Sequence, residues 1–169
     1  MKRTHHCGQL SGSDVGKSVS LIGWIDSIRD HGGILFIDLR DREGLTQVKA
    51  NPHSDDNAFN DLVRTLKDES VIEIEGLVEA REGDNVNSGL PTGEIEVDCS
   101  IVIVHNISDT PPFPIDDEKG DKVNEDLRLK YRYLDLRRGK MRRMLKLRHE
   151  TSRAIRNFMD DEGFYDVET

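Results

Sequence analysis

The sequence predicts a small five-stranded β-barrel that is followed by helices, and three observations support this prediction. Five stretches within residues 19–104 alternate apolar and polar residues, which is the pattern of half-buried strands. One stretch of helical periodicity falls between the third and the fourth of these strands. Two more helical patterns follow residue 126.

The five strands are separated by residues that favour turns, such as those at 30–33 and 42–44. We expect the strands at residues 19–26, 34–41, 45–50, 71–80 and 94–104. Gly23 and Gly76 lie inside the first and the fourth strand. Because glycine within a strand often marks a bulge or a bend, each of these two strands is predicted to bend at its glycine.

The helix between the third and fourth strands is predicted over residues 56–67. Its apolar residues recur at helical spacing: Phe59, Leu62, Val63 and Leu66. Three strands, a helix and two strands is the order of an OB-fold, a five-stranded Greek-key barrel. We therefore predict an all-β OB-fold domain over residues 1–105. The face of strands 2 and 3 of this fold commonly binds oligonucleotides, although a fold alone does not establish a function.

Residues 106–139 are predicted to form a linker or hinge. Prolines near its start stiffen the segment, and a short helix follows in which Leu127, Tyr131 and Leu134 share one face. This domain boundary rests on the change from alternating strands to proline-rich and charged sequence.

A longer amphipathic helix is predicted over residues 141–159, with Gly163 just beyond its end. Residues 164–167 are predicted to begin a strand. A helix with one apolar face and the start of a strand cannot bury themselves alone. We therefore expect residues 140–169 to be the truncated start of a further domain.

The charges of the chain are unevenly distributed. Residues 1–105 carry ten Lys and Arg against nineteen Asp and Glu, which accounts for the whole net charge of −9. Such an acidic domain cannot hold phosphates by bulk attraction, so any binding of nucleic acid must use shaped, local contacts. Residues 128–156 have a local charge of +10. We interpret this stretch as a solvated helical face beside a dimer or hinge contact, rather than as a general nucleic-acid-binding surface.

No stretch has the length and apolar character of a membrane span, and the N-terminus lacks the apolar segment of a signal peptide. Cys7 and Cys99 are far apart and form no CxxC pair, so we expect a reduced, cytoplasmic setting. His5, His6 and Cys7 are adjacent, but a structural zinc site needs four ligands, and no metal site is predicted.

Seven motifs follow one another at sensible spacing along the chain. They are CGQL at 7–10, GW at 23–24, RDHGG at 29–33, FIDLRDREG at 36–44, TGEIEV at 92–97, LRLKYRYLDLRR at 127–138 and FMDDEGFYDVET at 158–169. Together they resemble bacterial-type aspartyl-tRNA synthetases, the class II aspartate–tRNA ligases. The resemblance implies an N-terminal OB-fold that binds the anticodon, a hinge, and the motif 1 helix of the catalytic domain, which builds the dimer interface in that family.

For the parent protein the resemblance implies a homodimeric ligase that joins aspartate to tRNA(Asp) through an aspartyl-adenylate, with ATP and Mg²⁺. The family's motifs 2 and 3, which bind ATP and aspartate, are not among these 169 residues. We therefore assign no catalytic residue and no cofactor to the chain, and we expect it to be inactive alone. Two other hypotheses remain open. The chain could be a stand-alone OB-fold module that binds tRNA or a protein, or a single-strand binder that is indifferent to sequence.

Phe36 is the first candidate contact, because it lies on the mixed face of the second strand with Asp38 and Arg40, opposite the apolar face. The resemblance implies that its ring stacks on an anticodon base, a contact that contributes about 1–3 kcal/mol and needs no positive domain. The alternative is that Phe36 closes one end of the barrel as ordinary core.

Three polar side chains are further candidates. By resemblance Gln47 reads the edge of an unstacked base, and Glu96 accepts from the amino and imino groups of guanine. Arg29, at the end of the first strand, contacts a phosphate or a base edge. The pattern alone leaves each as a solvated strand residue, or Arg29 as the partner of Asp30 or Asp26. Many relatives carry an arginine cluster where this chain has Ser27 and Ile28, so we expect weaker binding that depends less on salt.

The remaining candidates lie in or beside the loop before the fifth strand, except for His31, which lies in the turn after the first strand. By resemblance Arg81, Asn85 and Asn87 are further tRNA contacts. His31 and Asp84 occupy positions associated with the choice between tRNA(Asp) alone and tRNA(Asp) with tRNA(Asn). A His-Gly turn resembles the second, non-discriminating type, which we expect here; the alternative is that His31 is a plain turn residue.

Overall fold

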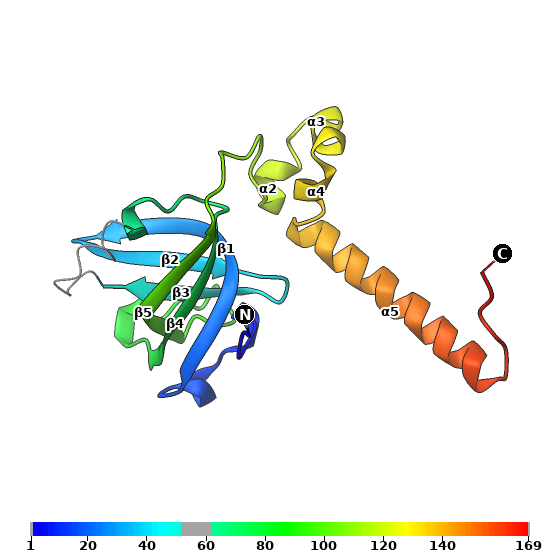
Figure 1. Ribbon diagram of the computed structural model, residues 1–169, viewed down its shortest axis with the longest axis horizontal. Coiled ribbons are helices and arrows are strands. Elements are labelled where there is room, and N and C mark those ends of the chain that lie inside the picture. Colours follow the sequence, from blue (N-terminus) through cyan, green and yellow to red (C-terminus); the bar gives the residue numbers. More distant parts are fainter. Residues whose placement is uncertain (1, 52–61, 169) are drawn as a thin grey trace. The chain divides into compact units, whose positions relative to one another are not determined.

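The computed structural model describes residues 2–51 and 62–168, and the chain divides into two compact units, Met1–Pro111 and Pro112–Thr169 (Figure 1). Within the described part of the first unit, five strands form a barrel. They are β1 (Ser18–His31), β2 (Ile34–Arg40), β3 (Leu45–Ala50), β4 (Val71–Ala80) and β5 (Ile95–Asn106). The predicted five-stranded barrel is confirmed, although β1 extends to His31, beyond its predicted end at residue 26.

The strands follow the order β1-β2-β3-β5-β4 around the barrel, which closes because β4 pairs with β1. Neighbouring strands are antiparallel except β3 and β5, which run parallel. The inward positions carry fully buried aliphatic side chains, among them Leu21, Ile37 and Val97. Since the interior is filled, the outward side chains are the ones available to a ligand.

Strand β1 changes the set of residues that it turns toward the core. Up to Ile25 the odd-numbered residues are buried, but the pairing with β2 shifts between Ile25 and Ser27, with Asp26 as the extra residue. Beyond this β-bulge Ile28 packs against the core and Arg29 is exposed. The bulge therefore turns the end of β1 so that Ser27 and Arg29 lie on the outer face.

The pairing register of β1 is regular at Gly23, and its irregularity lies at the bulge. A Cβ at Gly23 would come within 2.6 Å of the Arg40 carbonyl oxygen of the neighbouring strand, so this close approach requires glycine. The bend predicted at Gly76 is confirmed, since the register of β4 against β5 shifts between Glu75 and Gly76. A Cβ at Gly76 would lie 2.3 Å from the Asp98 carbonyl oxygen.

The N-terminal segment is attached to the turn between β2 and β3 by one buried carboxylate. Asp41 is 3% exposed, and its Oδ2 accepts from the Cys7 amide at 3.0 Å and lies 2.8 Å from His6 Nδ1. Its Oδ1 accepts from the Glu43 amide at 2.8 Å. Burial opposes ionisation of Asp41, but these hydrogen bonds outweigh it and lower the pKa of the carboxyl group. Burial also raises the pKa of the Cys7 thiol, so this thiol is inert at neutral pH.

Half of the helix predicted over residues 56–67, residues 56–61, lies outside the described residues. Of the described part, residues 62–67, only 62–64 are helical, so the helix ends before its predicted end at residue 67. The side chains of Val63 and Leu66 are buried in the barrel core.

The second unit contains four helices among its described residues, α2 (Asp117–Gly120), α3 (Glu125–Lys130), α4 (Arg132–Asp135) and α5 (Gly139–Asp161). The apolar face predicted for Leu127, Tyr131 and Leu134 is confirmed, because these side chains pack with Phe113 and Ile115. The single short helix expected there is instead divided at Tyr131, whose backbone leaves the helical region (φ −109°, ψ 47°). Helix α2 was not predicted, since its charged residues have no apolar period.

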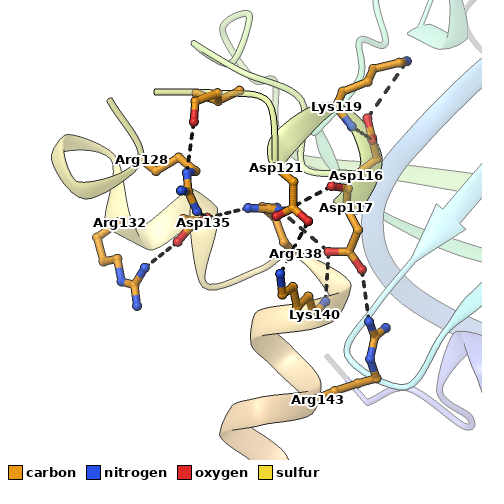
Figure 2. A network of polar contacts seen from close by, with 11 residues as sticks. Asp116, Asp117, Lys119, Asp121, Arg128, Arg132, Asp135, Arg138, Lys140 and Arg143 are labelled. Carbon is orange, nitrogen blue, oxygen red and sulfur yellow. Dashed lines mark hydrogen bonds and ion pairs between the residues drawn. The ribbon is translucent and has the colours of Figure 1, made fainter. Parts of the chain in front are cut away.

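A buried guanidinium organises this second unit (Figure 2). Arg138, 1% exposed, donates to Asp135 Oδ1 at 3.0 Å and to the carboxylate of Asp121 and the Asp117 carbonyl oxygen. Burial opposes the charge of Arg138, but its two carboxylate partners raise the pKa above its ordinary value. Asp117 also caps α5, because its carboxylate accepts from the Lys140 amide at 2.9 Å. The start of α5 is thereby fixed to α2 and α4.

Helix α5 carries its apolar side chains exposed, among them Met144, Ile155 and Phe158. The helix ends at Asp161, and Gly163 lies just beyond its C-cap, as predicted, with φ +83°. Phe164 N donates back to the Met159 carbonyl oxygen at 3.0 Å. The strand predicted at residues 164–167 is wrong for this chain, because the backbone there is irregular and no described strand lies beside it to pair with. No helix among the described residues, α5 included, has the length and apolar character needed to cross a membrane.

We expect the Arg138→Met substitution to destabilise the second unit by about 1.5–3 kcal/mol, because it removes the buried donor to Asp135 Oδ1 and leaves this fully buried carboxylate with Arg132 as its remaining hydrogen-bond donor. Hydrogen exchange of the amides within residues 113–138 measures this change. The control is Lys122→Met, which removes an exposed pair with Glu118 and should cost less than about 1 kcal/mol. Equal protection in the two variants would show that the buried network does not stabilise the unit.

Because of the Asp41 carboxylate, we expect the first unit to lose folding stability at low pH. Because its folded-state pKa lies below the unfolded value near 3.8, its contribution to stability is complete above that pH and is lost as the pH falls through the folded-state value. We expect Asp41→Asn to cost about 1–3 kcal/mol at pH 7, and progressively less as the pH falls below 3.8. Urea denaturation between pH 2.5 and 7 measures the difference. Glu82→Gln, a change at an exposed residue, is the control, and its effect on stability should not change in this way with pH.

Candidate nucleic-acid interface

The nine side chains predicted as contact or discrimination residues line one groove of about 610 Å³ on the barrel. They come from β1, β2, β3, β5 and the segment after β4: Arg29, His31, Phe36, Gln47, Arg81, Asp84, Asn85, Asn87 and Glu96. Val86 and Ser88, which the sequence did not point out, complete the lining. Residues that are up to sixty-seven positions apart in the sequence therefore face the same hollow.

Cross-strand register explains why these side chains converge. Ser27 of β1, Asp38 of β2 and Gln47 of β3 lie directly opposite one another, and the next outward row begins with Arg29 and Phe36. Outward residues in one row have side chains within reach of each other. A shift of any strand by one residue would turn its members of both rows into the core.

Phe36 lies at the surface of this groove and not in the sealed interior of the barrel. Its side chain is half-buried, whereas the neighbouring inward residues Ile37 and Leu39 are fully buried. The His31 ring meets the Phe36 ring edge to face, with the centroids 6.0 Å apart and the planes at 76°. One aromatic surface is thus held in place within a mainly polar groove, which is the arrangement needed to stack a planar ligand.

A chain of hydrogen bonds runs across the floor of the groove. Arg29 Nη2 donates to Gln47 Oε1 at 3.2 Å, and Gln47 Nε2 donates to Glu96 Oε2 at 2.9 Å. Glu96 in turn lies 3.8 Å from the guanidinium Nε of Arg81 and 3.8 Å from Lys49 Nζ. Gln47 keeps one N–H and one lone pair, and Glu96 keeps Oε1, so both retain hydrogen-bonding capacity for a ligand.

Arg81 is the most buried of the nine side chains and supports the loop that follows it. Its Nε donates to the Ile95 carbonyl oxygen at 2.9 Å, and Nη1 makes a long bond of 3.5 Å to the Asn85 carbonyl oxygen. Among the described residues, no group accepts a hydrogen bond from its buried Nη2. Burial lowers the pKa of Arg81, with Glu96 opposing the shift, although an arginine stays charged at neutral pH.

The loop after Arg81 is exposed and yet ordered by its own contacts. Residues 83–85 form a short 3₁₀ turn that includes Asp84. The Asn87 backbone amide donates to the Gly93 carbonyl oxygen at 3.0 Å, and its side-chain Oδ1 accepts from the Gly89 amide at 3.0 Å. The Asn87 side chain therefore stabilises the loop as well as lining the groove, and the sequence did not indicate this structural role.

The groove is close to electrically neutral. Among the lining residues, the two guanidinium groups of Arg29 and Arg81 are equal in number to the two carboxylates of Asp84 and Glu96. Asp38, which is not in the lining, pairs with Arg29. Lys49 at the edge is surrounded by carboxylates, at 2.8 Å from Glu79 and 3.3 Å from Asp98. Recognition must therefore depend on the direction of each donor and acceptor. Within the described residues, no cluster of three or more potential ligands could hold a metal ion.

A closed five-stranded barrel with an aromatic ring, amides and guanidinium groups around one groove defines an OB-fold of the nucleic-acid-binding kind. The chain belongs to the family of OB-fold nucleic acid binding domains, whose family model matches residues 19–104. A second family model, tRNA synthetases class II (D, K and N), matches residues 124–169. The first match falls in the barrel unit and the second in the helical unit.

More narrowly, the whole chain is similar to aspartate–tRNA ligases, which confirms the resemblance expected from the seven motifs. It is 58% identical over 170 residues to the aspartate–tRNA(Asp/Asn) ligase of Opitutus terrae and 49% identical over 169 residues to that of Halothermothrix orenii. It is 46% identical over 168 residues to the aspartate–tRNA ligase of Staphylococcus haemolyticus. These alignments cover 99–100% of this chain but only 28% of each relative, so the chain spans little more than a quarter of their length.

Solved structures share the fold. The aspartyl-tRNA synthetase of Entamoeba histolytica superposes with a TM-score of 0.84 at 19% identity, over 99% of this chain and 39% of that one. An OBody bound to hen egg-white lysozyme superposes with a TM-score of 0.55 at 23% identity, over 64% of this chain and 97% of the OBody. At such low identities the likeness establishes the fold, and both examples contain the OB-fold barrel.

Proposed function

We propose that the barrel recognises the anticodon of a tRNA as part of an aspartate–tRNA ligase. The observation that carries this proposal is the convergence of Phe36, Gln47 and Glu96 on one neutral groove of an acidic domain. Bulk charge would attract any nucleic acid, whereas a neutral groove with directed groups can prefer particular bases. The similarity to aspartate–tRNA ligases over the whole chain supports the choice of tRNA as the ligand.

Each groove residue has a role in this proposal. Phe36 stacks on one base, while Gln47 and Glu96 bind base edges with the hydrogen-bonding groups that their own network leaves free. Arg29 and Arg81 bind base edges or phosphates from either side of the groove. Asn85 and Asn87 contribute contacts from the loop.

For the parent protein we propose attachment of aspartate to tRNA(Asp) through an aspartyl-adenylate, with ATP and Mg²⁺ bound by residues that this chain does not supply. Catalysis therefore needs more than residues 1–169, and the exposed apolar face of α5 would lie at a homodimer interface. We place the enzyme in the cytoplasm. The alternative, a stand-alone module without catalysis, has the same groove but predicts that no ligase activity accompanies the chain in its natural context.

The primary test is the affinity of the 169-residue chain for anticodon stem-loops, with Phe36 as the first residue to vary. We expect Phe36→Leu to weaken binding of a GUC stem-loop by about 1–3 kcal/mol, because the leucine removes the stacking surface and keeps apolar bulk. Phe36→Tyr, the matched control, should bind within about threefold of the unchanged chain. Fluorescence titration gives the affinities and thermal melting verifies the fold. Equal affinity of the unchanged chain for GUC and unrelated stem-loops would refute anticodon recognition.

We further propose that the parent is of the non-discriminating type, which also charges tRNA(Asn). His31 lines the groove and holds the Phe36 ring edge to face, and two of the similar relatives above are named for both tRNAs. We expect the chain to bind GUC and GUU stem-loops with affinities within about threefold, and His31→Leu to separate them by about tenfold. Paired titrations measure the ratio. A chain that already prefers GUC tenfold would contradict this assignment.

A further inference from the structure

Arg29 uses its guanidinium in an unusual way for a side chain at a nucleic-acid groove. A single nitrogen, Nη2, makes all of its contacts: to Asp38 Oδ1 at 2.9 Å, to Asp38 Oδ2 at 3.0 Å and to Gln47 Oε1 at 3.2 Å. No hydrogen bond within residues 2–51 and 62–168 uses its Nε or Nη1, although the side chain is 48% exposed. One edge of the guanidinium is thus fixed and the other is presented outward.

Asp38, which fixes that edge, is itself held in place. Its side chain is only 14% exposed, and its Oδ2 accepts from the Ser27 hydroxyl at 2.8 Å. Ser27 lies opposite Asp38 in the pairing of β1 with β2, and Gln47 lies opposite it in the pairing of β2 with β3. Asp38 therefore stands in the middle of the row and beneath the groove, and it is not among the groove-lining residues.

The position of Arg29 also determines the orientation of the Gln47 side chain. The two ends of a glutamine amide have similar shapes but opposite hydrogen-bonding roles. Arg29 can only donate and an ionised Glu96 can only accept, so Gln47 must place Oε1 toward Arg29 and Nε2 toward Glu96. Releasing Arg29 removes the donor at one end and leaves the amide with one restraint.

We propose that Asp38 is a positioning residue for base recognition, which fixes Arg29 and through it the reading orientation of Gln47. The inference rests on the proposed function of the groove and deepens it. A carboxylate beneath a groove for a polyanion repels phosphates, so its presence weakens general attraction. By pairing with Arg29 it also removes most of that cation's net charge. Arg29 then contributes mainly the direction of its free Nε and Nη1 donors.

This role makes a prediction that a merely structural role does not. In Asp38→Asn the repulsive charge disappears, so binding of unrelated stem-loops should strengthen about twofold to threefold and depend more steeply on salt. Binding of the GUC stem-loop should weaken, because Arg29 and Gln47 lose their fixed orientation. We expect the preference for GUC over unrelated stem-loops to fall about tenfold.

The matched control is Asp26→Asn, which removes the same charge from the neighbouring strand. Asp26 accepts from Arg40 Nε at 2.6 Å, so the control also breaks an Arg–Asp pair, and it lies outside the groove lining. We expect Asp26→Asn to change the affinities for all stem-loops by the same factor, so that the preference for GUC over unrelated stem-loops is preserved. A preserved preference in Asp38→Asn, or an equal loss in Asp26→Asn, would overturn the proposal.

A second measurement does not depend on the ligand. The side-chain amide of Gln47 gives a pair of ¹H–¹⁵N resonances, which should shift and broaden in Asp38→Asn and stay unchanged in Asp26→Asn. Should Asp38→Asn fail to fold, Ser27→Ala removes one restraint on the same carboxylate and should give a smaller shift of the same kind. Unchanged Gln47 resonances in a folded Asp38→Asn would refute positioning. Absence of any base preference in the unchanged chain would instead refute the proposed function while this measurement still tests Asp38.

Discussion

The β-bulge in β1 is the constraint on which the binding face depends. Before the bulge, the odd-numbered residues of β1 fill the barrel, and a regular strand would have continued that alternation and turned Ser27 and Arg29 inward. The extra residue, Asp26, reverses the alternation, so that the end of the strand adds a polar row to the outer face. Because of this one extra residue, the odd-numbered residues of β1 face the core before the bulge and the groove after it.

Much of this architecture could be predicted from sequence, because closed barrels depend on local alternation. The ends of β3 and β4 agree with the alternation of residues 45–50 and 71–80. The bulge could not be predicted in the same way. Asp26 is an ordinary polar residue, and it becomes the extra residue only through the pairing of its neighbours with Leu39 and Asp38 of β2. The close approach of two backbones at Gly23 could not be predicted either, because a glycine allows close approach as readily as bending. The strand expected at residues 164–167 needs a neighbour that no local pattern can supply.

The same distinction applies to the groove. Family resemblance pointed to nine side chains that line it, and the alternation of β2 placed Phe36 on the outer face. Asp38 was visible only as a polar neighbour of Phe36, because its contacts to Ser27 and Arg29 join two strands through their register. Val86 and Ser88 could not be predicted as lining residues, because loop residues follow no periodic pattern that shows which way a side chain points. Contacts across strands are therefore what sequence reasoning missed.

The charge balance of the groove connects these observations. Each cation that faces it is close to a carboxylate, and the barrel as a whole is acidic, so a ligand gains little from approaching in a general orientation. A polyanion that binds here must displace or align with hydrogen bonds that already have a direction, from Arg29 to Gln47 to Glu96. Weak attraction combined with fixed direction favours discrimination over affinity, because a ligand with the wrong base edge loses contacts and is not compensated by charge. If the chain belongs to a ligase as proposed, the missing affinity would come from the other sites of that enzyme that hold the same tRNA.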